Sequence, residues 1–121
     1  MVIVDQATIE SFMHTQVACW NSGDKNGFFN AYQEIAPSGL QIEYVGNPKG
    51  DGWPILEGMW SEQRPKITIE EVALIVTGNE AVAHNRNSVN GTDLVIETIE
   101  HYLFDDKGAM QVRYFIQQPG E

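Results

Sequence analysis

The chain has 121 residues, of which 42% are hydrophobic and 20% charged, so it can form one globular domain with a single core. Seven Lys and Arg against seventeen Asp and Glu give a formal net charge of −10. This charge argues against nucleic acid or an anionic membrane surface as a partner, because phosphate binding needs clustered cations. A single cysteine, the lack of a basic-then-apolar start and the lack of an apolar run of transmembrane length predict a cytoplasmic protein.

The first third of the chain has the pattern of two helices. Asp5 is the predicted N-cap of a helix that runs through about Asn21. Its buried stripe is expected to contain Ile9, Phe12, Met13, Val17 and Trp20. Gln16 falls inside this stripe, where a polar side chain is unusual. The segment Ser22-Gly23-Asp24 ends this helix and caps a second one, whose inner face is expected to contain Phe28, Phe29 and Tyr32.

The rest of the chain is predicted to be mostly strand. A short strand (40–45), a loop (46–52) and a short helical piece with Trp60 (53–63) precede four strands, expected at 66–77, 80–90, 92–104 and 110–117. Helices first and an antiparallel meander last predict an α+β fold. The N-terminal helices should pack on one face of a strongly curved, mostly antiparallel sheet, and together they should enclose a cone-shaped pocket. We expect residues 1–121 to form this one domain.

Glu100 is the most informative residue. It lies in the middle of a run of β-branched and aromatic residues, 95–104, in which alternation places Thr98 and Tyr102 on the same face as Glu100. Both faces of this strand are largely apolar, so both should be covered. A carboxylate in such a place costs stability unless it is paired or protonated. We therefore expect the chemistry of this protein to lie around Glu100.

The order of the elements and several strings resemble the nuclear-transport-factor-2-like (NTF2-like) superfamily, in particular its SnoaL-like polyketide-cyclase and ketosteroid-isomerase-like branches. The strings are Trp20-Asn21-Ser22-Gly23-Asp24, Tyr32 on the second helix, Gly78-Asn79-Glu80-Ala81-Val82 and Ile99-Glu100-His101-Tyr102-Leu103-Phe104. Ketosteroid isomerases use a tyrosine of the first helix and a protonated acid as an oxyanion hole. The resemblance matches Glu100 to that acid, but Gln16 to the tyrosine and Tyr44 to the catalytic aspartate, so a steroid isomerase of the known kind is not expected.

The strand pairing of this superfamily predicts which neighbouring residues share the pocket with Glu100. The expected inward sets are Val82, His84, Arg86 and Ser88 on one flanking strand, and Gln111, Arg113, Phe115 and Gln117 on the other. This reading depends on the absence of a bulge, since one extra residue reverses the faces. The outward residues would be strongly apolar, and they include Val95, Ile99, Leu103, Met110, Val112, Tyr114 and Ile116. A monomer would expose them, so we expect a homodimer through the outer sheet face.

The candidate catalytic residues are His84, Glu100 and Tyr44. His84 is either a proton carrier or a structural histidine, and Glu100 is either an acid or charge stabiliser or the centre of a buried ion pair. Arg86 and Arg113 could grip a substrate oxygen or only neutralise Glu100. Tyr44 could donate to an oxyanion or only form part of the wall. The expected substrate-binding residues are Gln16, Tyr32, Trp60, Arg86, Thr98, Tyr102, Arg113, Phe115 and Gln117.

These residues predict a cofactor-independent acid–base enzyme: an isomerase, a dehydratase or other lyase, or a cyclase. Its substrate would be a small, mostly apolar molecule with a carbonyl or hydroxyl group. His84 with Glu100 resembles the pairing of dehydratases on this scaffold. A non-catalytic small-molecule-binding module and a protein-binding module are the alternatives. No metal is expected, because no histidine pair has ligand spacing and there is no Cys or His cluster.

Overall fold

The computed structural model describes residues 4–117. The elements are α1 (Gln6–Ser22), α2 (Lys25–Ile35), β1 (Gly39–Tyr44), β2 (Gly50–Asp51), α3 (Gly52–Gly58), the π-helical η1 (Met59–Gln63), β3 (Ile67–Thr77), β4 (Glu80–Val89), β5 (Val95–Phe104) and β6 (Ala109–Ile116). This order confirms the predicted elements. It adds the two-residue β2 inside the expected loop. None of the helices within residues 4–117 is long and apolar enough to cross a membrane.

The helix ends follow from capping. The Asp5 side chain accepts a hydrogen bond from the Thr8 backbone N–H, and Asp24 accepts one from the backbone N–H of Gly27. Between the two helices, Gly23 has φ of 77° and donates its N–H to the last turn of α1. This left-handed conformation favours glycine, so the sequence can end one helix and start the next within two residues.

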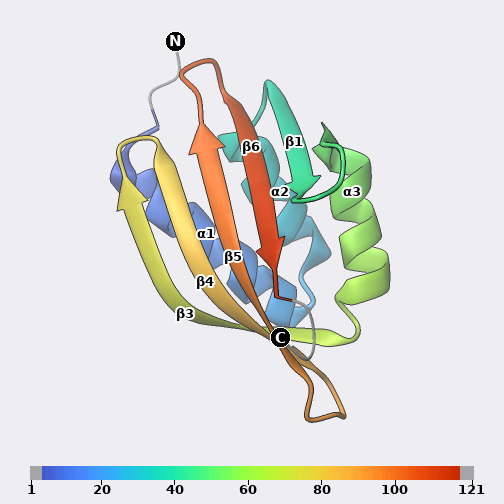
Figure 1. Ribbon diagram of the computed structural model, residues 1–121. Helices are drawn as coiled ribbons and strands as arrows, with labels where there is room; N and C mark the ends of the chain where they lie inside the picture. The colour runs from blue at the N-terminus through green and yellow to red at the C-terminus, as the bar shows by residue number, and fades with distance from the viewer. Residues whose placement is uncertain (1–3, 118–121) are drawn as a thin grey trace.

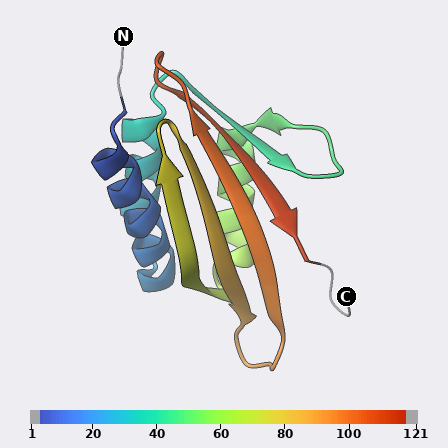
Figure 2. The ribbon, with the colours of Figure 1, turned by 60° about the vertical axis from the view of Figure 1, so that its left-hand side comes forward.

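The sheet has the strand order β2-β1-β6-β5-β4-β3. β1 and β6 are parallel, and all other neighbours are antiparallel. Figure 1 shows α1 and α2 together on one face of this sheet, and α3 beside β1. The long strands β3 and β4 are curved along their length (Figure 1), and Figure 2 shows α1 beside the edge strand β3. A register shift between Glu71 and Ala73 interrupts the β3–β4 pairing, and such a bulge adds local twist. The result is the predicted curved α+β cone.

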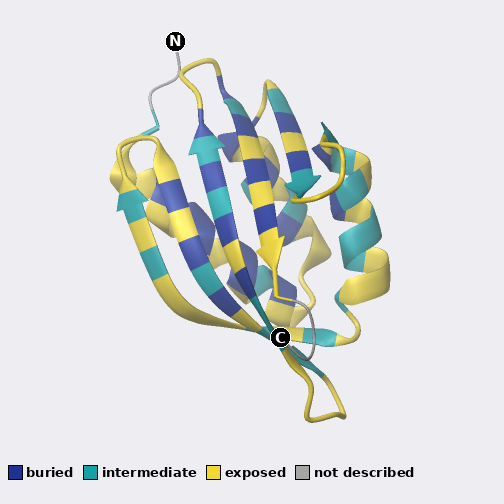
Figure 3. Ribbon diagram, in the orientation of Figure 1, coloured by how far each residue is buried: buried dark blue, intermediate teal, exposed yellow. Residues whose placement is uncertain are grey.

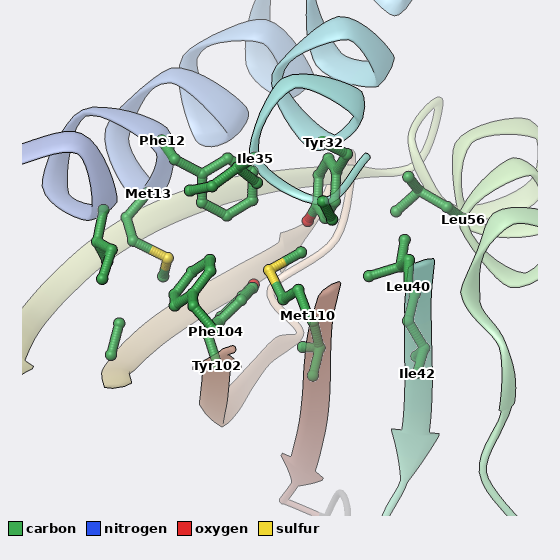
Figure 4. Packing of buried hydrophobic residues seen from close by; sticks show 14 of the residues in the cluster. Phe12, Met13, Tyr32, Ile35, Leu40, Ile42, Leu56, Tyr102, Phe104 and Met110 are labelled. Carbon is green, nitrogen blue, oxygen red and sulfur yellow. The ribbon is translucent and has the colours of Figure 1, made fainter. Parts of the chain in front are cut away.

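The core lies between the helices and the concave face of the sheet. Figure 3 shows buried residues alternating with intermediate or exposed ones along much of β4, β5 and β6, as expected for strands that cover a core on one side only. Figure 4 shows how buried side chains of the helices meet those of the strands. The residues that it labels are Phe12, Met13, Tyr32, Ile35, Leu40, Ile42, Leu56, Tyr102, Phe104 and Met110.

The prediction of which residues of β4 and β6 point inward was wrong: the inward positions are shifted by one residue along each strand. Glu100 lies opposite Ala83 on β4 and opposite Tyr114 on β6, and directly opposed residues share a face. The buried residues are therefore Ala81, Ala83 and Asn85 on β4, and Met110, Val112 and Tyr114 on β6. The residues expected inside lie instead on the alternate, outer positions; these are Val82, His84, Arg86, Ser88, Gln111, Arg113, Phe115 and Gln117.

Two phenylalanines test this assignment by a matched substitution. Phe104 is 1% exposed and Phe115, which we expected in the core, is 39% exposed. Phe104→Ala should lower the free energy of unfolding by about 3–5 kcal/mol, because it removes a fully buried ring and leaves a cavity. Phe115→Ala should have a much smaller effect. Urea denaturation of both variants checks this, and equal losses of stability would show that the assigned face of β6 is wrong.

Candidate functional site

A cavity of about 170 Å³ opens between the helices and the inner face of the sheet. Its wall is mostly apolar, with a polar group around Glu100. The lining residues are Gln16, Val17, Trp20, Phe28, Tyr32, Tyr44, Met59, Gln63, Ile67, Ile69, Asn85, Asn87, Ile96, Thr98, Glu100, Tyr114 and Ile116. A dry cavity of ~150 Å³ holds one benzene molecule, whereas drug-sized ligands need roughly 300–1,000 Å³. The cavity therefore has room for a single-ring molecule.

Glu100 is buried in the wall of this cavity and is held by three side chains. The Tyr102 hydroxyl donates to its Oε1 at 2.7 Å. The Thr98 hydroxyl and the Asn85 Nδ2 donate to its Oε2, at 2.9 and 3.1 Å. Thr98 Oγ1 in turn accepts a hydrogen bond from Nδ2 of Asn87 at 3.2 Å. The donors come from β4 and β5, so the carboxyl group is fixed by the sheet itself.

A second set of hydrogen bonds connects the helices to Glu100 and explains the buried Gln16. Nε2 of Gln16 donates to the Tyr102 hydroxyl at 3.1 Å, and its Oε1 accepts from the Tyr32 hydroxyl at 2.8 Å. Gln16 therefore joins α1, α2 and β5. Because the Tyr102 oxygen already accepts from Gln16, its proton is directed at Glu100. The hydrogen bonds of the network thus converge on one carboxyl group.

No positively charged side chain in the described part of the chain forms an ion pair with Glu100. Among the residues that line the cavity there is no Lys, Arg or His. Burial raises the pKa of Glu100 above its ordinary value, and the hydrogen bonds from Tyr102, Thr98 and Asn85 oppose this shift only in part. Burial, with the nearby Glu100, also raises the pKa of Tyr44. The site is thus an apolar cavity with one acid whose proton is held more tightly than usual.

Several predicted site residues do lie together. Gln16, Tyr32, Tyr44, Thr98 and Glu100 all line the cavity. Tyr102 is fully buried and reaches Glu100 through its hydroxyl. Trp60 is partly buried and packs against Trp20 and Phe28, which line the cavity.

The predicted partners of Glu100 lie elsewhere. Nε2 of His84 is 2.7 Å from Oε1 of Glu97, which also accepts a hydrogen bond from Arg86. This group lies on the outer face of β4 and β5. The hydrogen bonds from His84 and Arg86 lower the pKa of Glu97. The expected pairing of His84 with Glu100 in one pocket was therefore wrong.

The last strand shows the same reversal. Arg113 donates to Glu43 at 3.2 Å and lies over the ring of Phe115, on the outer side of β6 and β1. Gln117, just after β6, borders the same outer surface groove as His84 and Phe115. Arg86 and Arg113 consequently do not neutralise Glu100, so the buried ion pair that the sequence suggested does not form.

Sequence reasoning missed two asparagines of the site, Asn85 and Asn87. They follow Ala81 and Ala83 on alternate positions of β4, and all four face inward. The two small alanines point to a packed interior, while His84 and Arg86, on the alternate positions of the same strand, drew attention to the wrong face. Within the described residues 4–117, no three His, Cys, Asp or Glu side chains cluster in a way that could hold a metal ion.

Comparisons with known proteins place this site in a known fold. No protein-family model matches the sequence, and none of the curated proteins matches it. Among solved structures, a provisionally assigned ketosteroid isomerase from Kribbella flavida is 13% identical, with a TM-score of 0.75 over 98% of this chain and 84% of that one. A protein of unknown function from Burkholderia xenovorans is 18% identical, with a TM-score of 0.73 over 96% and 88%.

These similarities show the class of fold, which is an α+β cone whose helices and curved sheet enclose a pocket. The chain has the nuclear-transport-factor-2-like fold, which SnoaL-like and ketosteroid-isomerase-like structures share. A de novo designed protein with a curved sheet is equally similar, at 14% identity and a TM-score of 0.73 over 93% of this chain and 88% of that one. The fold alone therefore names no activity.

The raised pKa of Glu100 predicts how stability depends on pH. Folding raises the pKa of this carboxyl group above its value in the unfolded chain, which is near 4.5. The group therefore contributes stability that is fully present at a pH below the unfolded-state pKa and is lost as the pH rises through the folded-state pKa. The free energy of unfolding of the wild type minus that of Glu100→Gln should therefore fall between pH 4.5 and 8. The expected fall is about 1.4 kcal/mol for each unit of the shift.

Urea denaturation of both proteins across this pH range measures the difference, in which the titration of all other groups cancels. A Glu97→Gln variant is the control, because the pKa of Glu97 is lowered rather than raised. A difference for Glu100→Gln that stays constant or rises with pH would contradict a raised pKa at Glu100.

Proposed function

We propose that this protein is a cofactor-independent acid–base catalyst that uses Glu100 to move a proton on a small, mostly apolar molecule. The substrate has about the size of one ring and bears a carbonyl or hydroxyl group. The observation that supports this most strongly is a single buried carboxyl group in the wall of an apolar cavity, with no cation beside it. Acid–base catalysts work best when their pKa lies near the working pH, and burial moves Glu100 in that direction.

Tyr44 is the second group of the proposed chemistry. It is partly buried, lines the cavity and stacks on Tyr114 with the ring centroids 5.5 Å apart. Within the described residues its hydroxyl makes no hydrogen bond of its own, so it can donate one to a negatively charged substrate oxygen. Removal of a proton beside a carbonyl places charge on that oxygen, and a fixed donor stabilises the charge. Glu100 as proton carrier and Tyr44 as donor replace the predicted pair of His84 and Glu100.

Proton abstraction and return of this kind serve isomerisation, elimination of water and cyclisation alike. The enzyme is therefore proposed as an isomerase or a lyase of this general type. A binding function without catalysis is the second candidate. It is favoured by the three donors on Glu100, because a carboxyl group so engaged can also act as a fixed structural centre between β4 and β5.

Hydrogen–deuterium exchange at carbons beside a carbonyl tests the proposed proton transfer without knowledge of the natural substrate. Cyclohexanone and hydroxyacetone in deuterated buffer are suitable probes, followed by NMR. The wild type should accelerate the exchange. Glu100→Gln should reduce the acceleration by about 10²–10⁴-fold, the range for loss of a general acid–base group.

His84→Ala is the matched control and should exchange like the wild type, because His84 lies on the outer face. Loss of exchange in His84→Ala with normal exchange in Glu100→Gln would refute the proposed role of Glu100. Binding of the probes without any accelerated exchange would favour the second candidate.

We also propose that the outer sheet face pairs two copies of this chain. Ile99 lies opposite His84 on β4 and Phe115 on β6, and Ile99 and Phe115 are both exposed. Val82 and Val95 are further exposed apolar residues of this face. Ion pairs flank the apolar row, with His84 and Arg86 on Glu97 and with Arg113 on Glu43. A surface with both signs of charge around an apolar centre can match itself in a twofold dimer.

A charged residue at the centre of this surface should separate the copies. Ile99→Lys should shift the mass measured by light scattering at micromolar concentration from a dimer to a monomer. Leu94→Lys is the control, because Leu94 is similarly exposed but lies just before β5, outside the sheet. A wild type that is already monomeric at this concentration would disprove the dimer. Val112, which we expected on this surface, is buried in the core and is unsuitable for the test.

A further inference from the structure

We infer that the ligand of this cavity presents a hydrogen-bond donor, a hydroxyl or an N–H group, to Oδ1 of Asn85 beside Glu100. The inference rests on one part of the proposed function, namely that a small molecule occupies the cavity. It goes further by naming the polar group that this molecule must carry. It also makes Asn85 the residue that determines specificity.

Asn85 is the residue that carries the argument. It lines the cavity and is only 2% exposed. Its Nδ2 donates to Oε2 of Glu100 at 3.1 Å. Its Oδ1 is the one buried side-chain oxygen or nitrogen within residues 4–117 that has no hydrogen-bond partner. Folded proteins pair nearly all such atoms, so an unpaired one in the wall of a cavity points to a partner from outside the chain.

The neighbours of Asn85 explain why the chain does not supply that partner. Asn85 lies opposite Thr98 in the β4–β5 pairing, and the Thr98 hydroxyl is engaged with Glu100. The amide of Asn87 is engaged with the carbonyl of Ile96 and with Thr98. Gln16 is engaged with Tyr32 and Tyr102. Thr98, Asn87 and Gln16 are thus occupied by other partners, and the Asn85 oxygen is left over.

The orientation of the Asn85 amide sets the chemical class of the ligand. Because its N–H group faces the Glu100 carboxylate, it is the oxygen that remains, and an amide oxygen can only accept. A ligand whose polar atom is only an acceptor, such as a simple ketone, leaves this oxygen buried and unpaired. Leaving a buried acceptor unpaired lowers affinity by about tenfold or more. A ligand with a hydroxyl or N–H group avoids this loss and can also approach Glu100.

Two kinds of donor satisfy the geometry. A neutral hydroxyl needs only the Asn85 oxygen. A protonated amine would in addition meet the charge of Glu100 and the aromatic faces of Trp20 and Tyr44, which attract cations. Both kinds of ligand share a hydrogen-bond donor, and comparing the affinity of a hydroxyl ligand with that of an amine ligand shows which kind the cavity prefers.

Four probes that share one ring test the inference on the full chain by isothermal titration calorimetry. Benzyl alcohol and benzylamine carry donors, acetophenone carries only an acceptor, and ethylbenzene carries neither. At least one donor probe should bind about tenfold or more tightly than acetophenone and ethylbenzene. Tighter binding of benzylamine would indicate a cationic donor, and tighter binding of benzyl alcohol a neutral one. Equal or tighter binding of acetophenone, or no binding of any probe, would overturn the inference.

The variant Asn85→Leu should abolish this preference and retain the binding of ethylbenzene. His84→Leu is the matched control, because His84 is the adjacent residue on β4 and faces away from the cavity. It should keep the preference. If Asn85→Leu does not fold, the side-chain amide resonances of Asn85 in the wild type replace it. They should shift with the tighter donor probe and not with ethylbenzene, and an unchanged resonance would count against the inference.

These results separate the inference from the proposed function. Donor-selective binding without any accelerated deuterium exchange would remove the proposed catalysis and keep the inference. Accelerated exchange that depends on Glu100, together with a preference for acetophenone, would support the proposed catalysis and overturn the inference.

Discussion

The hydrogen bonds that converge on Glu100 are the interaction on which the inner architecture depends. A carboxyl group buried without a cation destabilises the folded state unless donors surround it. Here the donors come from β4 and β5 directly, and from α1 and α2 through Gln16 and Tyr102. The same bonds that make the buried acid tolerable therefore fix the distance between the helices and the sheet. In this chain the site is also part of the core.

This dual role explains why polar residues interrupt otherwise apolar patterns. Gln16 stands in the buried stripe of α1, and Asn85 follows two inward alanines on β4. Each would be unfavourable alone, but each is bound to another member of the network. A network of this kind rigidifies a core when its members are satisfied. Within residues 4–117 the one buried side-chain oxygen or nitrogen left without a partner is Oδ1 of Asn85, and this is the atom at which we infer that a ligand joins the network.

The sequence predicted the elements well because their limits depend on local chemistry. Asp5, Gly23 and Asp24 act at the helix ends as their side chains and backbone preferences dictate. Glu100 was recognised because its own strand contains the evidence for burial. The partners of Glu100 could not be found in this way, because the face of a neighbouring strand depends on how many residues the connecting loop contains. A difference of one residue exchanges Asn85 for His84 and Tyr114 for Arg113.

The parallel pairing of β1 with β6 has a consequence for how the molecule is made. β1 ends at Tyr44, and its partner begins only at Ala109. A chain synthesised from its N-terminus therefore carries β1 without this neighbour until almost all other elements exist, and closing so long a loop is slow. Tyr44 and Tyr114, which stack across this pairing, meet only at that moment. The wall of the cavity is thus completed by β6, the last of the described strands, and until then the edges of β1 and β5 that pair with β6 are open to chaperones and to other chains.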